Sequence, residues 1–204
     1  MKRIHDFYVA IGHLICKICN TIFRLKFGSI KEKSVLFVSH PDDDTLFFHT
    51  AIKKEKPYVV LLTTGWSLKR LHDFIKVMHY YGVKFCVYDI NEHAKHIEEQ
   101  INKHVQAILK KGDFKKCFTH NKEGEYGHDT HRLVHKCVVR NAACEIFVPV
   151  SKERIEQFSL DPETVKEKEF IFTRFYKTET FVIDEYRTWM IHEKLERVVP
   201  NEKD

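Results

Sequence analysis

The sequence predicts an α/β fold: a Rossmann-like, mostly parallel sheet with helices on both faces and an active site at the carboxyl ends of the strands. Short runs of apolar and β-branched residues alternate with helical patterns from residue 34 onward. These runs are continuously apolar, as in strands that are buried on both faces. Only 7 glycines and 5 prolines occur among 204 residues, which argues against a loop-rich or fibrous chain.

The expected elements follow one another in alternation. Runs typical of strands are residues 34–38, 58–63, 84–88, 116–119 and 145–150. Helical patterns cover residues 46–54, 68–81, 91–111, 128–143, 162–176 and a segment near 184–197. Gly82 and Gly112 are typical helix stops, and Asp161 followed by Pro162 is a typical helix start. Strands separated by helices in this way favour a parallel sheet.

The length suits one domain, residues 34–204, preceded by a basic arm of residues 1–33. The arm holds seven Lys and Arg residues against two acids, and the rest of the chain holds 27 of each sign. The net charge of +5 therefore belongs to the arm. Because the body of the chain is electrically balanced, we expect no nucleic-acid partner.

The arm shows an apolar helical face, formed by Ile4, Phe7, Tyr8, Ile11, Leu14, Ile15, Ile18, Ile22 and Leu25. Its longest uncharged stretch, residues 7–16, is too short to span a bilayer. Two interpretations stay open: the arm packs on the domain, or it lies on an anionic membrane surface. Free cysteines within apolar runs and no clear secretion signal predict a cytoplasmic protein, or one at the inner face of the membrane.

The strongest chemical signal is Ser39-His40-Pro41-Asp42-Asp43-Asp44, directly after the first expected strand. Loops at the carboxyl ends of strands line the active site in such sheets. Neighbouring carboxylates repel one another and resist burial, and a bound metal ion removes that cost. One histidine and one carboxylate can bind the ion while another carboxylate faces water. Taken alone, the motif fits equally well a polar loop in which Asp44 caps the next helix.

A second polar cluster follows the fourth expected strand and contains Gly127-His128-Asp129-Thr130-His131. His128 and His131 are three residues apart at an expected helix start, so they share a face. A histidine gains nothing from a helix N-terminus, which favours anions. The pair therefore favours a His/Asp/His metal site with open positions for water and substrate.

Together these motifs resemble the PIG-L/LmbE family of metal-dependent de-N-acetylases over residues 34–150. That family shows an HPDDE loop and a GHxxH element, often preceded by Thr-His-Asn. This chain carries HPDDD, then Thr119-His120-Asn121, then GEYGHDTH, in the same order. The resemblance implies hydrolysis of the N-acetyl group of an N-acetylhexosamine in a glycolipid, a glycan precursor or a glycoside. The products are acetate and a free amino sugar.

Residue by residue, the resemblance implies that His40, Asp43 and His131 bind one divalent ion. Zinc is the default, and two histidines with one carboxylate also accept Fe²⁺. The partner would be an N-acetylated amino sugar, which can be lipid-linked and thereby bring the arm into contact with a membrane.

The remaining implied roles belong to four side chains. Asp42 would be the general base, and His128 would stabilise the oxyanion or protonate the leaving amine. Arg70 and Tyr126 match residues that contact substrate in similar enzymes.

Two positions depart from the family pattern. Asp44 stands where the family has Glu and still suits a helix cap, and Thr130 replaces the proline of the GHPDH form. Neither change removes an expected ligand. Two other hypotheses remain: a different metal-dependent amide hydrolase, and a catalytically silent glycan-binding protein on the same fold.

Overall fold

The structure, a computed structural model, describes residues 30–198. Residues 1–29 of the expected arm lie outside the described residues, so both interpretations of the arm stay predictions. The described part opens with Ile30, which forms an isolated parallel bridge with Gly112 just before the first strand.

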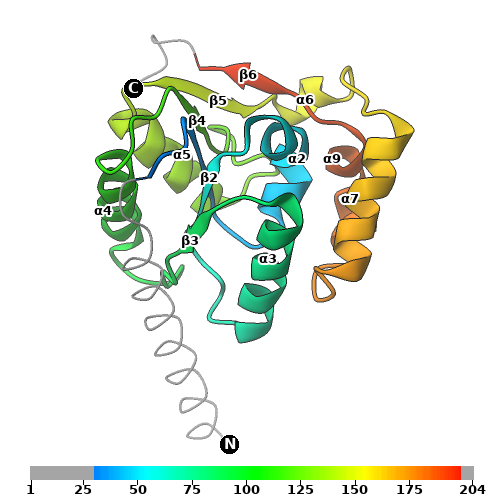
Figure 1. The fold of residues 1–204 in the computed structure, drawn as a ribbon, viewed down its shortest axis with the longest axis horizontal. Coiled ribbons are helices and arrows are strands. Elements are labelled where there is room, and N and C mark those ends of the chain that lie inside the picture. The colour runs from blue at the N-terminus through cyan, green and yellow to red at the C-terminus, as the bar shows by residue number, and fades with distance from the viewer. Residues whose placement is uncertain (1–29, 199–204) are drawn as a thin grey trace, which may run out of the picture.

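Within residues 30–198, six strands form one sheet in the order β3-β2-β1-β4-β5-β6 (Figure 1). They are β1 (Ser34–Val38), β2 (Tyr58–Leu61), β3 (Phe85–Val87), β4 (Lys116–Phe118), β5 (Glu145–Pro149) and β6 (Leu195–Arg197). The first five are parallel, and β6 pairs antiparallel with β5. The predicted α/β class with a mostly parallel sheet is confirmed.

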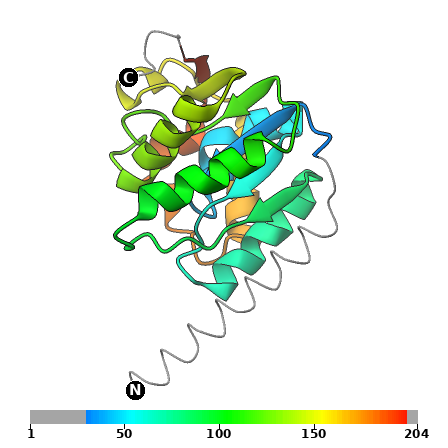
Figure 2. The same ribbon diagram turned by 90° about the vertical axis from the view of Figure 1, so that its left-hand side faces the viewer.

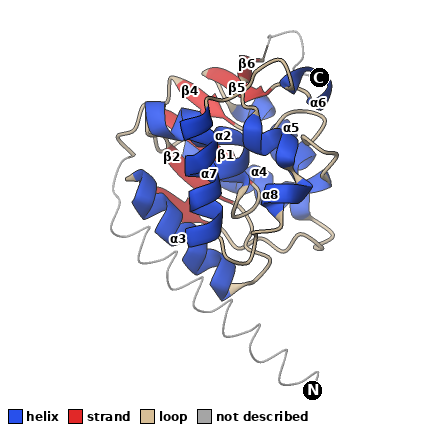
Figure 3. Ribbon diagram, turned by 90° about the vertical axis from the view of Figure 1, so that its right-hand side faces the viewer, coloured by secondary structure: helices blue, strands red, loops and turns tan. Residues whose placement is uncertain are grey.

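Helices cover both faces of this sheet (Figure 1). One face carries α4 (Ile97–Leu109) and α5 (Asp129–Asn141), the green helices in front of the sheet in Figure 2. The opposite face carries α2 (Asp43–Glu55), α3 (Leu68–Tyr81), α7 (Pro162–Arg174) and α9 (Arg187–Ile191), of which α2, α3 and α7 stand in front in Figure 3. Two short helices, α6 (Lys152–Ile155) and α8 (Val182–Glu185), lie in the connections. None of the helices in residues 30–198 combines the length and apolar character needed to cross a membrane.

Alternate residues of each strand feed two separate cores, which explains the continuously apolar runs. In β1, Leu36 and Val38 belong to the core under α2 and α3, whereas Val35 and Phe37 belong to the core under α4 and α5. All four side chains are fully buried. A strand buried on both faces cannot alternate apolar and polar residues.

The strand order reverses direction between β1 and β4. The chain leaves β1 toward β2 on one side and leaves β4 toward β5 on the other. The loops after these two adjacent strands therefore meet at the carboxyl edge of the sheet, at a topological switch point. Both polar motifs of the sequence are in these loops, which brings them together.

Several expected bounds differ from the structure. The helix expected at residues 91–111 begins only at Ile97, because residues 91–96 form a loop in which the Asn91 side chain accepts the His93 amide. The helix expected near 184–197 is wrong: the chain forms α8 and α9 and then β6. Leu195, Glu196 and Arg197 of β6 pair with β5, and this pairing satisfies backbone groups of an otherwise open sheet edge.

One fully buried cation joins the C-terminal helices to the rest of the domain. The Lys168 ammonium in α7 donates to the carbonyls of Leu46 (2.9 Å) and Trp189 (2.7 Å) and lies 3.4 Å from the Glu193 carboxylate. Burial lowers the pKa of Lys168 and raises the pKa of Glu193. Because Leu46 belongs to α2 and Trp189 to α9, this contact fixes three elements relative to one another.

Replacing Lys168 with Ala should cost about 3–5 kcal/mol of unfolding free energy, since it leaves the Glu193 carboxylate buried without its cation. Urea denaturation followed by circular dichroism measures this cost. The control is Lys166→Ala in the same helix, an exposed position where we expect a change within about 0.5 kcal/mol. A Lys168→Ala protein as stable as this control would contradict a stabilising role for the contacts of Lys168.

Candidate active site

The two loops at the switch point bring the expected site residues together. His40 and Asp42 follow β1, and Asp43 is the first residue of α2. His128 is the N-cap of α5, and His131 lies in the first turn of that helix. The spacing of these residues in the sequence therefore becomes proximity across two neighbouring strands.

The three expected metal ligands form a compact triangle. His40 Nδ1 lies 3.2 Å from His131 Nε2. Asp43 Oδ2 lies 3.4 Å from His40 Nδ1, and Asp43 Oδ1 lies 3.4 Å from His131 Nε2. Ligands bound to zinc at 2.0–2.1 Å in a tetrahedron are separated by about 3.3–3.4 Å. The three contacts are close to this edge length, and the two that involve Asp43 are made by its two different carboxylate oxygens.

Two overlapping groups can hold a metal ion among the described residues: His40 with His128 and His131, and Asp43 with His120 and His131. Both ring nitrogens of His120 already have partners. Nε2 accepts the Ser39 amide (3.0 Å), and Nδ1 lies 3.0 Å from Glu125 Oε2. A nitrogen that accepts a backbone N–H has no lone pair for a metal. His120 is therefore a poor ligand, and His40, Asp43 and His131, the ligands that the resemblance implies, are members of these two groups.

Two carboxylates orient the ligand histidines from behind. Glu125 Oε2 lies 2.7 Å from His131 Nδ1, and Glu92 Oε2 lies 3.0 Å from His40 Nε2. These contacts fix the ring orientations and leave His131 Nε2 and His40 Nδ1 facing Asp43. Carboxylates bonded to the remote nitrogens of metal ligands also raise ligand basicity. Burial alone would raise the pKa of Glu92, but the contacts with His40 and Thr63 lower it to about 2.

The loop that supplies Glu125 depends on a glycine. Gly124 has φ +72°, and a Cβ there would meet the His128 carbonyl oxygen at 2.5 Å. Its own carbonyl accepts the amides of Tyr126, Gly127 and His128 at 2.7–3.1 Å. This tight turn directs Glu125, which is 2% exposed, inward behind the histidines.

Asp42 has an unusual backbone conformation, with φ 102° and ψ −37°. A residue with a side chain pays roughly 1–3 kcal/mol for such a conformation. The turn is held because the Asp42 carbonyl accepts the amides of Thr45 (3.0 Å) and Leu46 (2.8 Å). As a result, Asp42 and Asp43 both line the same cavity although they are adjacent in sequence.

Burial and the neighbouring Asp43 charge raise the pKa of Asp42 well above its usual range. Burial acts in the same direction on Asp43, but His131 and His120 hold its pKa well below the usual range. The environment therefore separates two adjacent acids: Asp43 carries the charge in the histidine cluster, and Asp42 is the carboxyl that can exchange a proton.

Asp44 does not cap α2, contrary to the expectation. The N-cap position is Asp42, and Asp44 lies in the first turn, fully buried. Its carboxyl accepts hydrogen bonds from the Tyr176 hydroxyl (2.6 Å) and the Thr45 hydroxyl (3.0 Å). The third acid of the motif thus anchors the loop to the segment after α7.

A cavity of about 230 Å³ opens in front of the metal triangle. His128 lines it; its Nδ1 accepts the Thr130 amide (3.3 Å), which leaves Nε2 as the nitrogen that can donate. Tyr126 also lines it and packs against Tyr186 with ring centroids 4.6 Å apart. Arg70 lies in the same wall, where its Nε is 2.7 Å from Glu179 Oε1.

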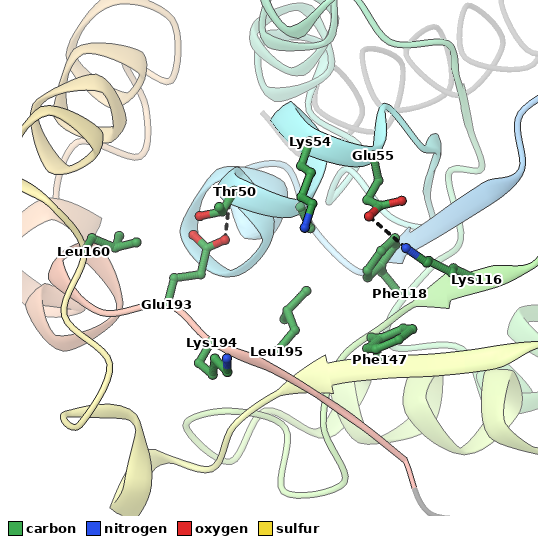
Figure 4. A pocket seen from close by; sticks show the side chains of 11 residues that line it. Thr50, Lys54, Glu55, Lys116, Phe118, Phe147, Leu160, Glu193, Lys194 and Leu195 are labelled. Atoms are coloured by element: carbon green, nitrogen blue, oxygen red, sulfur yellow. Dashed lines mark hydrogen bonds and ion pairs between the residues drawn. The ribbon is translucent and has the colours of Figure 1, made fainter.

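A larger cavity of about 360 Å³ lies between α2 and strands β4–β6 (Figure 4). Phe118, Phe147 and Leu195 line its apolar side. None of its lining residues is a histidine, and its two acids have partners: Glu55 pairs with a lysine, and Glu193 bonds to α2 and α7. Its lining residues therefore offer no histidine–carboxylate group, and the smaller cavity is the candidate active site.

Sequence reasoning missed three acids of this site. Glu125 was visible in the GEYGH element, but no local pattern shows that it faces inward. Glu92 lies in a stretch that reads as helix, and Glu179 lies beyond the residues covered by the resemblance. His120, which only its place before the GEYGH element suggested, lies behind the ligands and stacks on His131 with ring centroids 3.8 Å apart.

Comparisons with known proteins bear on the fold. No protein-family model matches the chain. The uncharacterized protein L374 of Acanthamoeba polyphaga mimivirus is 22% identical, over 52% of this chain and 56% of that protein. The chain thus matches about half the length of this relative.

One similar solved structure is GalB, the 4-carboxy-2-hydroxymuconate hydratase of Pseudomonas putida KT2440. The TM-score is 0.52 at 14% identity, over 82% of this chain and 97% of that chain. This likeness shows the fold, which the chain shares with an enzyme.

The triangle predicts about one divalent ion per chain, measured by inductively coupled plasma mass spectrometry on purified protein. His131→Ala should remove the ion, because it removes one of three ligands. His128→Ala should keep it, because His128 is not part of the triangle, and His96→Ala is the exposed control. A folded His131→Ala protein at full occupancy would refute the assignment.

Glu125→Gln should weaken zinc binding by roughly 10–100-fold, as loss of a carboxylate behind a metal ligand does. A glutamine has a single oxygen acceptor and cannot accept the same three hydrogen bonds. Competition with a chromogenic chelator measures the affinity. Glu123→Gln changes an exposed acid of the same loop and should leave the affinity unchanged; equal affinities of the two variants would overturn the role of Glu125.

Proposed function

We propose that this protein is a metal-dependent hydrolase that removes the N-acetyl group from an N-acetylhexosamine in a glycolipid, a glycan precursor or a glycoside. The observation that carries the proposal is the cluster of His40, Asp43 and His131, whose donor atoms lie 3.2–3.4 Å from one another, with Asp42 and His128 beside it in the cavity wall. The resemblance of the two motifs to PIG-L/LmbE enzymes supports the reaction type.

A divalent ion, zinc or Fe²⁺, held by the triangle would polarise the amide carbonyl, lower the pKa of an attacking water, and favour the ionised form of Asp42. Asp42 then accepts the proton of the attacking water. His128, whose Nε2 is free to donate, stabilises the oxyanion or protonates the leaving amine. Acetate and a free amine result.

The walls of the cavity suit one sugar ring. Its volume of about 230 Å³ is small, and the cavity is open on one side, so the rest of a larger substrate can extend into solvent. Tyr126 and Tyr186 offer aromatic surface for the C–H face of a sugar. Carboxylates in the same wall accept hydrogen bonds from hydroxyl groups.

A lipid-linked substrate is part of this proposal. Phe181 lines the cavity yet is 51% exposed, so it offers apolar surface at the mouth. The basic arm would hold the protein at the inner face of a membrane, where such a substrate resides.

Three other functions compete. A different amide hydrolase would use the same residues on another acyl group, and a silent glycan-binding protein would bind sugar without turnover. A hydratase is the third, because GalB acts on 4-carboxy-2-hydroxymuconate. Its acidic substrate fits poorly in a cavity lined by four acids.

The zinc-loaded protein should release acetate from a panel of N-acetylglucosamine conjugates and should not hydrate 4-carboxy-2-hydroxymuconate. Asp42→Asn should lower turnover roughly a hundredfold or more and keep the metal, because it removes only the general base. A coupled acetate assay and metal analysis are the measurements. Asp129→Asn, at an exposed position beside His128, is the control.

Hydration of 4-carboxy-2-hydroxymuconate without acetate release would favour the hydratase. If Asp42→Asn lost the ion, Asp42 would be the metal ligand and Asp43 the general base.

A further inference from the structure

We propose that the Arg70–Glu179 ion pair makes the cavity selective for uncharged amino-sugar substrates and against those that carry a phosphate or carboxylate. The substrate class rests on the proposed function. The pair itself is a structural feature of the chain and can be tested with simple anions.

The guanidinium of Arg70 is engaged on two sides. Its Nε lies 2.7 Å from Glu179 Oε1, and its Nη2 donates to the Pro41 carbonyl at 3.3 Å. Glu179 is 6% exposed, and in the described residues Arg70 is its ion-pair partner. A buried carboxylate of this kind keeps the arginine fixed and electrically compensated.

Among residues 30–198, Arg70 is the Lys or Arg side chain that lines the cavity. Its lining residues include four acids, Asp42, Asp43, Glu92 and Glu179, against the single arginine. A divalent ion at the triangle offsets two of these charges and is reserved for the reacting carbonyl. An anionic substituent on the sugar would therefore face carboxylates with no free positive partner.

The same groups favour a neutral polyol. Glu92 and Glu179 come from different loops, after β3 and after α7, and both line the cavity, where they can accept hydrogen bonds from hydroxyls of one ring. The amine released by deacetylation becomes an ammonium, which the acids stabilise. A lone Arg70 would have the opposite preference, because a free guanidinium is a strong ligand for phosphate and carboxylate.

Glu179→Gln keeps the shape of the side chain and removes its charge, so it should free Arg70 to bind anions. The test uses full-length, zinc-loaded protein and isothermal titration with inorganic phosphate, N-acetylglucosamine and N-acetylglucosamine 6-phosphate. Glu169→Gln is the matched control, because it removes the acid of the exposed Arg187 pair with the same change in charge.

The wild type should bind the neutral sugar at least about tenfold more tightly than its phosphate, which is 1.4 kcal/mol. Glu179→Gln should bind inorganic phosphate and the sugar phosphate about tenfold more tightly than the wild type does, and Glu169→Gln should not. Adding Arg70→Gln to Glu179→Gln should abolish this gain. A wild type that binds both sugars equally, or a Glu179→Gln protein with unchanged phosphate affinity, would overturn the proposal.

The two proposals fail separately. If neither sugar binds but Glu179→Gln gains phosphate affinity, the ion pair acts as inferred and the amino-sugar function falls. If Glu179→Gln does not fold, the wild-type preference between the two sugars still decides, because it needs no variant.

Discussion

Asp43 is a buried carboxylate, 2% exposed, with three histidine rings around it, and the rest of the site is arranged to make that burial tolerable. Its Oδ2 accepts the His40 amide at 2.7 Å, and its two oxygens face His40, His120 and His131 at 3.4–3.5 Å. Each ring needs its own tautomer fixed from behind, which is the task of Glu92 and Glu125. Stabilising this one buried negative charge therefore involves two further acids, which lie in the loops after β3 and β4.

The sheet supports this arrangement. Five parallel strands with apolar residues on both faces fix the spacing of the loops that carry the site residues. The two cavities differ in the chemistry of their lining residues. The larger one, beside α2 and β4–β6, has apolar surface and paired charges, whereas the smaller one has acids and histidines at strand ends.

The elements whose signals are local were predictable from the sequence. The bounds of β1 and α3 agree with expectation because an unbroken apolar run, and Ser67 and Gly82 at the helix ends, determine them. The region near 184–197 was not predictable, because the pairing of β6 with β5 joins residues about fifty positions apart. Among the site residues, those in the two motifs lie together as their order implied. Glu92 and Glu179 could not be found, since a single acid in a loop has no pattern until the fold places it beside His40 or Arg70.

The residues proposed to act on the amide and the residues of the C-terminal cavity wall come from different parts of the chain, which affects how the protein can evolve. The groups proposed to act on the amide come from the loops after β1 and β4, whereas Glu179, Phe181 and Tyr186 come from the connection between α7 and α9. The buried Lys168 does not line the cavity and holds the helices that flank this connection, α7 and α9, against α2. Substitutions in the C-terminal part can therefore reshape the cavity wall without touching the histidine cluster, so substrate choice and chemistry can diverge independently.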